Sequence, residues 1–182
     1  MKVRVLLSEQ ELDITLNRLS HQLIENHNDF SDSVIIALQP RGMHVAGRIV
    51  QKLSEKGIKP PPLGALDITF FRDDFRRREE PLSANQTRID FLVEGKKVIF
   101  VDDVLYTGRS VRAALDAINS FGRPAQVELL VLIDRRLSRH LPIQPDYVGR
   151  VVDSVASEKV VVRWKEKDQN DSVELISANY HE

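Results

Sequence analysis

The spacing of apolar positions along the chain predicts strands that alternate with helices. Residues 3–7 alternate between apolar and polar types, as in a strand with one buried face. Ser8 and Glu11 then have the spacing of a helix-capping box, and the leucines that follow form one helical stripe, namely Leu12, Leu16, Leu19 and Leu23. Strands covered on both faces are expected at two unbroken apolar runs, over residues 34–38 and 98–101, and a further buried strand is expected over residues 127–133.

Two further helices complete the alternation. One begins after Gln39-Pro40-Arg41-Gly42 and ends at Gly57, with inward positions at Val45, Ile49, Val50 and Leu53. The other runs from Ser110 to Phe121 and ends at Gly122. Shorter strands are expected over residues 65–71 and around 147–148 and 160–162. Buried strands that alternate with helices predict an α/β fold with a mainly parallel central sheet flanked by helices.

Residues 72–96 do not fit this pattern. The stretch from Arg72 to Glu80 is densely charged and lacks an apolar face, while Ile89, Phe91 and Val93 alternate like one arm of a hairpin. Long loops in compact domains are usually functional or disordered. We therefore expect a single domain over residues 1–182, with a flexible flap at about residues 72–96.

Composition narrows the class of protein. The 182 residues, 42% hydrophobic and 29% charged, provide one good core and too little chain for two ordinary domains. No apolar run approaches a membrane span, and the first residues lack the apolar block of a signal peptide. Cysteine is absent, which excludes disulfides and thiolate metal sites and fits a cytoplasmic protein. The net charge of −1 means that any nucleic-acid binding would need a local basic patch.

The strongest chemical signal follows the apolar run over residues 98–101. Asp102 and Asp103 come directly after it, and the turn Tyr106-Thr107-Gly108-Arg109-Ser110 then leads into a helix. Ligands of open α/β sheets bind beyond the carboxyl ends of the strands. Backbone N–H groups and hydroxyls at a helix start suit a phosphate monoester, whereas carboxylates suit sugar hydroxyls or a metal ion. The segment is therefore expected to bind ribose 5-phosphate.

Two other interpretations of this segment stay open. An Asp-Asp pair before a glycine turn can be a purely structural strand-to-helix connection. A signalling receiver domain also carries paired aspartates at a strand end, but it does not require the phosphate-binding turn four residues later. Other common phosphate motifs fit poorly, because the sequence contains neither G-x-x-x-x-G-K-[ST] nor G-x-G-x-x-G.

The chain resembles the type I phosphoribosyltransferases and, more narrowly, the family of bifunctional pyrimidine operon regulators and uracil phosphoribosyltransferases. Residues 98–110 resemble the 5-phosphoribosyl 1-pyrophosphate (PRPP) signature of the larger group. Tyr106 before Thr107-Gly108 is typical of the narrower family. The other matching pieces run in order along nearly the whole chain: Arg41-Gly42, Asp67-Ile68-Thr69, Arg72-Asp73-Asp74, Gly122-Arg123-Pro124, Asp134-Arg135, Leu141-Pro142-Ile143, Asp146-Tyr147-Val148-Gly149, Ser157-Glu158-Lys159-Val160 and Asp168-Gln169-Asn170-Asp171.

The resemblance implies the type I phosphoribosyltransferase fold, with a flap or hood, and a role for each matching site residue. Asp102 and Asp103 would be catalytic, accepting the ribose hydroxyls directly or through a metal ion, and Arg41 would clamp the pyrophosphate. Asp134 would face the base or cap a loop. The substrate-binding residues implied are Arg41, Gly42, Arg72, Val98, Ile99, Phe100, Val101, Asp102, Asp103, Val104, Leu105, Tyr106, Thr107, Gly108, Arg109, Ser110, Asp134, and the base-binding turn Tyr147 and Val148.

The implied reaction joins uracil to PRPP and gives UMP and pyrophosphate. Mg²⁺ is the implied cofactor, with Asp102 and Asp103 as its protein ligands. The choice of base depends on Tyr106, because purine-type relatives carry an aspartate at that place as a proton acceptor, whereas tyrosine is a weak base at neutral pH. A purine-base phosphoribosyltransferase without an RNA-binding role stays the alternative, and Tyr106 can also serve packing alone.

The resemblance also implies that UMP promotes binding to pyrimidine-operon leader RNA, which would control transcription by attenuation. The candidate RNA-binding residues are Arg18, His21, Arg136, Arg139 and Arg150. The sequence after Asp134-Arg135, namely Arg136-Leu137-Ser138-Arg139-His140, departs from the glycine-containing loop expected there. The family further suggests a homodimer or a larger homo-oligomer, without a membrane partner.

Overall fold

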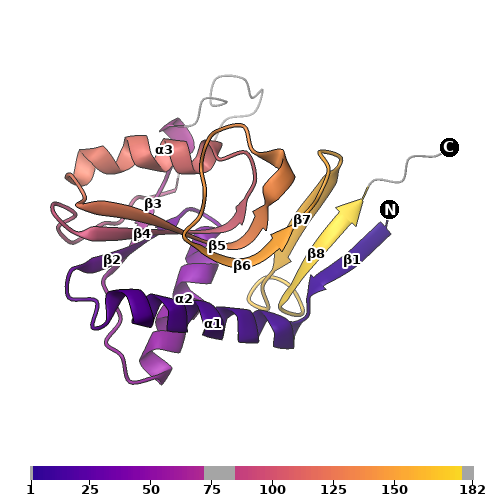
Figure 1. The fold of residues 1–182 in the computed structure, drawn as a ribbon, viewed down its shortest axis with the longest axis horizontal. Coiled ribbons are helices and arrows are strands. Elements are labelled where there is room, and N and C mark those ends of the chain that lie inside the picture. Colours follow the sequence, from indigo (N-terminus) through magenta and orange to yellow (C-terminus); the bar gives the residue numbers. More distant parts are fainter. Residues whose placement is uncertain (1, 72–84, 178–182) are drawn as a thin grey trace.

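The computed structural model describes residues 2–71 and 85–177, which form two separate sheets (Figure 1). The larger sheet is parallel and has the order β3-β2-β4-β5-β6. Its strands are β2 (Ser33–Leu38), β3 (Leu63–Leu66), β4 (Lys97–Leu105), β5 (Gln126–Arg135) and β6 (Tyr147–Val152). The smaller sheet is antiparallel in the order β1-β8-β7, with β1 (Lys2–Leu7), β7 (Glu158–Arg163) and β8 (Ser172–Ser177).

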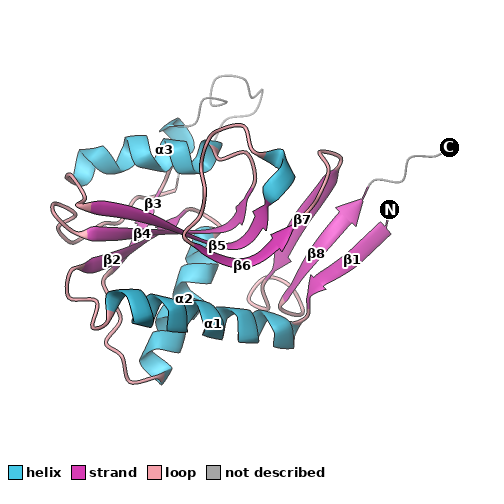
Figure 2. Ribbon diagram, viewed as in Figure 1, coloured by secondary structure: helices cyan, strands magenta, loops and turns pink. Residues whose placement is uncertain are grey.

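Helices cover both faces of the larger sheet (Figure 2). Helices α1 (Glu9–His27) and α2 (Gly42–Glu55) lie on one face, and α3 (Arg109–Ile118) lies on the other. Short 3-10 helices follow at Thr69–Phe71, Asn119–Phe121 and Arg136–Ser138. The predicted α/β fold with a mainly parallel central sheet is therefore confirmed.

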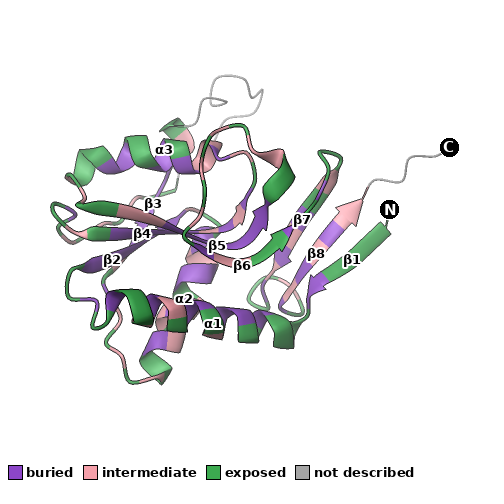
Figure 3. Cartoon of the chain, in the orientation of Figure 1, coloured by how far each residue is buried: buried purple, intermediate pink, exposed green. Residues whose placement is uncertain are grey.

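The apolar run at 98–101 shows why the sheet needs cover on both sides. Ile99 and Val101 point into the core beside α1 and α2, while Val98 and Phe100 point into the core beside α3. All four side chains are fully buried (Figure 3). Because successive residues of a strand face opposite sides, a strand buried on both sides has no polar alternation to show.

The capping box at the start of α1 is present as predicted. The Ser8 backbone N–H donates to Glu11 Oε2 at 2.8 Å, and the Glu11 N–H donates back to Ser8 Oγ at 3.3 Å. Each side chain satisfies a backbone N–H that the helix itself leaves without a partner. The start of α1 is thus set by local sequence.

One expected strand has other bounds, and one expected hairpin arm is absent from the described residues. The strand predicted over residues 65–71 ends at Leu66, because the Asp67 carboxylate accepts hydrogen bonds from the backbone and hydroxyl of Thr69 and turns the chain into a 3-10 helix. The hairpin arm predicted near residues 89–93 is absent from residues 85–96, which contain only a single bridge from Arg88 to Ala65. The alternating apolar residues there pack into the core beside α3.

The predicted flap falls only partly within the described chain. Residues 72–84, which include Arg72, lie outside the described residues. Among the described residues, no helix has the length and apolar character to cross a membrane.

Candidate active site

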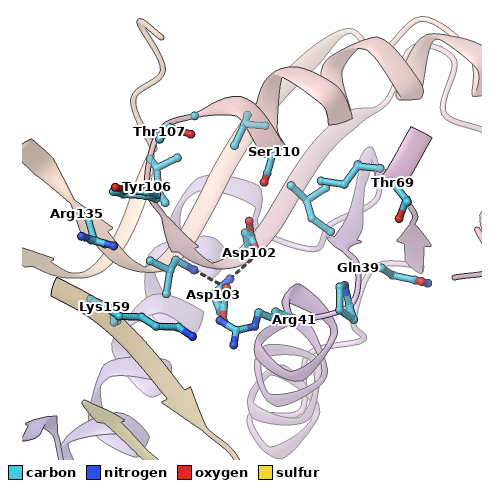
Figure 4. A pocket seen from close by; sticks show the side chains of 18 residues that line it. Gln39, Arg41, Thr69, Asp102, Asp103, Tyr106, Thr107, Ser110, Arg135 and Lys159 are labelled. Carbon is cyan, nitrogen blue, oxygen red and sulfur yellow. Dashed lines mark hydrogen bonds and ion pairs between the residues drawn. The ribbon is translucent and has the colours of Figure 1, made fainter. Parts of the chain in front are cut away.

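A cavity of about 520 Å³ lies where β2 and β4 end (Figure 4). Its walls come from the loop after β2, from the end of β4 with the turn that follows, and from β7 of the smaller sheet. Parallel strands bring their carboxyl ends to one edge, which is where open α/β sheets bind ligands. Nine of the nineteen substrate-binding residues expected from the sequence line it, namely Arg41, Asp102, Asp103, Val104, Leu105, Tyr106, Thr107, Gly108 and Ser110.

The turn between β4 and α3 has the geometry of an anion site. Gly108 precedes the first residue of α3 and has a φ of 89°, a left-handed conformation that glycine adopts without strain. Thr107, Gly108 and Ser110 all line the cavity at this helix start. The N–H groups and the positive end of the helix dipole there favour a bound phosphate.

Two carboxylates lie at the other end of the same wall. The Asp103 N–H donates to Asp102 Oδ1 at 2.9 Å, and the Val104 N–H donates to Asp103 Oδ1 at 2.7 Å. Burial raises the pKa of Asp102 well above its ordinary value, and the neighbouring Asp103 charge adds to this. Burial also raises the pKa of Asp103, while Arg41 opposes that shift. Carboxylates in such a place accept hydrogen bonds from hydroxyls or bind a cation.

Gly42 is required because two backbones approach closely. A Cβ added to Gly42 would lie 2.2 Å from the Val101 carbonyl oxygen, well inside van der Waals contact. The glycine lets the first turn of α2 sit directly against β4. That contact positions Arg41, the preceding residue, over Asp103 with Arg41 Nη1 3.3 Å from Asp103 Oδ2.

Some residues expected to bind substrate do not reach the cavity. The run at 98–101 is fully buried in the two cores and does not line the cavity, so its position supports Asp102 and a substrate contact for these four residues stays a prediction. Gly42, Arg109, Asp134 and Val148 are also not among the cavity-lining residues within the described chain. Asp134 is buried and forms an ion pair with Arg139, which favours the loop role over the base role.

Tyr147 lies in the wrong place for stacking on a base. It is in register with Leu130 of β5, which is itself in register with Val101, so its side chain faces the core beside α1. Its hydroxyl donates to Glu128 Oε2 at 2.7 Å and accepts from Asn26 at 3.1 Å. Burial raises the pKa of this hydroxyl. The base-binding role predicted for Tyr147 therefore does not fit its position.

The cavity also contains residues that sequence reasoning missed as site residues. Arg135, Lys159 and Val160 line it, as does Thr69. Lys159 extends from β7 beside Arg41 and Asp103 in Figure 4. The Ser157-Glu158-Lys159-Val160 match was a signal for the β7 residues, but it gave no role.

The comparisons with known proteins agree with this geometry. A family model described as phosphoribosyl transferase domain matches residues 4–167. The Bifunctional protein PyrR of Desulfosudis oleivorans is 44% identical over 167 residues, covering 92% of each chain. Those of Synechocystis and Bacillus subtilis are 41% and 39% identical, each covering 94% of this chain and 95% of the relative.

The chain belongs to the PyrR family of phosphoribosyltransferases. Solved phosphoribosyltransferase structures share its fold. The hypoxanthine phosphoribosyltransferase of Trypanosoma cruzi has a TM-score of 0.73 at 14% identity and covers 97% of each chain. That of Staphylococcus aureus has a TM-score of 0.69 at 17% identity, covering 93% of this chain and 90% of its own. The type I phosphoribosyltransferase fold is thereby confirmed.

The last family motif in this PyrR-family chain has a structural role. Asp168 accepts a hydrogen bond from the Trp164 N–H at 3.1 Å, and Asp171 accepts one from the Lys165 N–H at 2.7 Å. Asp171 also pairs with Arg48 of α2 at 3.0 Å, and the Arg48 guanidinium lies 5.5 Å from the centre of the Trp164 ring. The motif closes the β7–β8 turn and ties the smaller sheet to α2.

The candidate RNA-binding residues of this PyrR-family chain fall into two groups, one on α1 and β6 and the other in the segment after β5. Arg18 donates to the carbonyls of Val148 and Gly149, and Arg150 donates to the Leu6 carbonyl, while His21 is exposed one turn beyond Arg18. Arg136 is exposed and pairs with Asp153 at 2.8 Å. Arg139 is held internally by Asp134 and by the Tyr106 carbonyl, which leaves it little freedom for RNA.

Proposed function

We propose that this protein is a uracil phosphoribosyltransferase, which converts uracil and PRPP into UMP and pyrophosphate. One observation carries the proposal: the cavity has a helix-start phosphate site at Thr107–Ser110 and a carboxylate pair at Asp102 and Asp103 on one continuous wall. A phosphate at one end and hydroxyls at the other describe a ribose 5-phosphate. The carboxylates and the phosphate site are proposed to bind the ribose 5-phosphate part of PRPP, and Arg41 is proposed to bind its pyrophosphate.

In this mechanism the bond between the ribose C1 and pyrophosphate breaks, and a new bond forms from C1 to a ring nitrogen of the base. Positive charge develops on the ribose ring as pyrophosphate departs, and the carboxylates hold the ring hydroxyls on the reacting face. Arg41, whose side chain is 52% exposed at the cavity, stabilises the charge on the departing pyrophosphate. As the new bond forms, the ring nitrogen of uracil loses its proton, which passes to solvent or to the departing pyrophosphate.

Mg²⁺ fits the donors that the site offers. Asp102 and Asp103 provide hard oxygen atoms, the ligands that Mg²⁺ prefers. Within the described residues, no group of three or more His, Cys, Asp or Glu side chains could hold a metal ion. Bound Mg²⁺ would neutralise pyrophosphate charge and, since it usually keeps waters and substrate oxygens as ligands, would need only these carboxylates from the protein.

The base is proposed to lie against Val160 and Lys159, where β7 closes the cavity. Uracil is favoured over a purine because Tyr106, and no carboxylate, precedes Thr107-Gly108. Uracil loses its ring proton more readily than an ordinary amide, so it needs less help from a side-chain base. The pH–rate profile should therefore rise toward the ionisation of uracil.

The test is competition between bases. Purified protein with labelled PRPP and Mg²⁺ is incubated with uracil, hypoxanthine and guanine at equal concentrations, and the nucleotides are separated. We expect UMP to form fastest. Faster formation of IMP or GMP would make this a purine salvage enzyme.

Regulation through RNA is a second proposed function, favoured by the basic groups at the α1–β6 edge and by the name of the curated PyrR relatives. Pyrimidine-operon leader RNA should bind with an affinity that falls with salt and rises with UMP. The matched variants are Arg18→Gln on this edge and Arg136→Gln near the loop after β5. Equal binding of an unrelated structured RNA would count against specific regulation.

The remaining expectations are part of the same proposal. We propose one catalytic domain with a flap at about residues 72–96 that shields the reacting sugar from water. We also propose a cytoplasmic homo-oligomer. Limited proteolysis with and without PRPP, and light scattering in solution, test the flap and the assembly.

A further inference from the structure

The Tyr106 ring lies against a buried arginine at the back of the phosphate-binding turn. The Arg135 guanidinium carbon is 4.0 Å from the centre of the ring, and both residues line the cavity (Figure 4). Tyr106 is 37% exposed, whereas Arg135 is only 5% exposed. The attraction between a cation and an aromatic face is stronger when the cation is buried away from water than when it is exposed.

Arg135 is fixed from its other side by the connection between β6 and β7. Its Nε donates to Ser154 Oγ at 2.8 Å. One terminal nitrogen donates to the carbonyls of Val155 and Glu158, at 3.0 and 2.9 Å. Because three acceptors occupy the planar fork, the guanidinium has a single orientation. Tyr106 therefore rests on a surface that is set by the start of β7.

The backbone of the turn is held by hydrogen bonds from the segment that follows β5, at residues 139–141. Arg139 donates to the Tyr106 carbonyl at 2.6 Å. The N–H groups of His140 and Leu141 donate to the Thr107 carbonyl at 3.0 and 3.2 Å. The ring of Tyr106 and the backbone of the turn are thus both supported by residues from the end of β5 and the segment that follows it.

We propose that Arg135 is a positioning residue for the ribose 5-phosphate: it fixes Tyr106, and through it the phosphate-binding turn, relative to the β6–β7 connection. The inference rests on the proposed PRPP activity and names a determinant of that site. Loss of the stack weakens binding of phosphorylated ribose more than binding of the base. Lysine cannot replace Arg135, because an ammonium group has no planar fork for three fixed acceptors.

The experiment measures PRPP binding with Mg²⁺, and ribose 5-phosphate binding alone, by calorimetry without a base. The variants are Arg135→Lys, Tyr106→Leu and Tyr106→Phe. The matched control is Arg163→Lys, which makes the same exchange at an arginine that ties β7 to Glu174 and Asp168 away from the cavity. Arg135→Lys and Tyr106→Leu should weaken PRPP binding about fivefold or more. Tyr106→Phe keeps the ring and should bind PRPP more tightly than Tyr106→Leu.

Steady-state kinetics separate positioning from a general loss of structure. In the folded variants the KM for PRPP should rise while the KM for uracil stays at the wild-type value. Wild-type PRPP affinity in both Arg135→Lys and Tyr106→Leu, or an equal rise in both KM values, overturns the inference. If Arg135→Lys does not fold, Ser154→Ala decides, because it removes the acceptor that holds Arg135 Nε and leaves Arg135 and Tyr106 themselves unchanged.

The same data keep this inference apart from the proposed function. If the wild-type protein forms no UMP but the two variants still weaken ribose 5-phosphate binding, the proposed reaction fails and the positioning role holds. If the wild-type protein forms UMP and the variants bind PRPP normally, the positioning role fails and the reaction holds.

Discussion

Arg41 Nη1 lies 3.3 Å from Asp103 Oδ2, although 62 positions separate the two residues in the sequence. The arginine side chain is half exposed, whereas the carboxylate is 6% exposed. The ion pair holds the proposed pyrophosphate clamp beside the proposed ribose ligands. A pyrophosphate group entering the cavity can take over the exposed guanidinium, because the carboxylate keeps its bond from the Val104 N–H.

Changing Asp102 and Asp103 together to Asn should preserve the fold and lower kcat by about 100-fold or more, as for other losses of a preorganised charged site. The amides keep the shape of the side chains but neither the charge nor the preference for hydroxyl donors. Circular dichroism checks the fold, and UMP formation at saturating PRPP checks the rate. Near-normal turnover in a well-folded double variant would remove these residues from the mechanism.

Asp102→Asn alone should raise the free energy of unfolding at neutral pH. Burial raises the folded-state pKa of Asp102, so the folded protein holds this proton more tightly than the unfolded chain. The resulting stabilisation is full below the ordinary aspartate pKa and is lost as pH rises through the folded-state pKa. Each unit of pKa difference corresponds to about 1.4 kcal/mol.

Urea unfolding is measured between pH 4 and pH 8 and expressed as variant minus wild type, which reports how the substitution changes the titration of the Asp102 and Asp103 pair. The advantage of Asp102→Asn should be small at the acid end and should grow with pH. A difference that is constant across the range contradicts the assigned cause.

Gly42→Ala should cost about 1–3 kcal/mol of stability, as overpacking of a close contact does. The added Cβ would lie 2.2 Å from the Val101 carbonyl oxygen and would push the start of α2 off β4. The turn that carries Arg41 would move with it, so the KM for PRPP should also rise. Thermal unfolding and steady-state kinetics measure the two effects.

Gly47→Ala is the matched control within the same helix. Beyond the adjoining residues and backbone of its own helix, no atom of the described residues lies within 4 Å of a Cβ added there, and Gly47 is not among the glycines with positive φ. Alanine should stabilise α2 by up to about 1 kcal/mol, because glycine is a poor helix former. Equal destabilisation by both substitutions would mean that the contact with Val101 is not the cause.

Tyr147→Phe should cost about 1–2 kcal/mol of stability and leave the KM for uracil unchanged. The substitution removes the hydroxyl that bonds to Glu128 and Asn26 on the α1 side of the sheet, and leaves the packed ring in place.

Lys159→Met should show the opposite behaviour, with a higher KM for uracil and little change in stability, since Lys159 is exposed at the cavity. A raised uracil KM in Tyr147→Phe would restore the base-binding role for Tyr147.

The sequence by itself determined the features that depend on neighbouring residues. The capping box joins Ser8 and Glu11 across three positions, and its bonds form without help from the rest of the fold. The proposed phosphate site is equally local, because Gly108 and the start of α3 lie only a few residues after the carboxylates. The unbroken apolar run at 98–101 predicted a strand that is buried on both faces. Each of these is a relation between positions a few residues apart.

The tertiary structure alone decided which distant residues share the cavity. A strand's period of two says that Tyr147 and Val148 face opposite sides, but it does not say which side is the site. Pairing with Leu130 turned Tyr147 toward α1 and away from the cavity. Arg135 and Lys159 both line the cavity because the smaller sheet packs against the end of β5. No local sequence pattern predicts that contact. The physical reason is that strand pairing and sheet packing join residues far apart in sequence, and their geometry exists only once the whole core has formed.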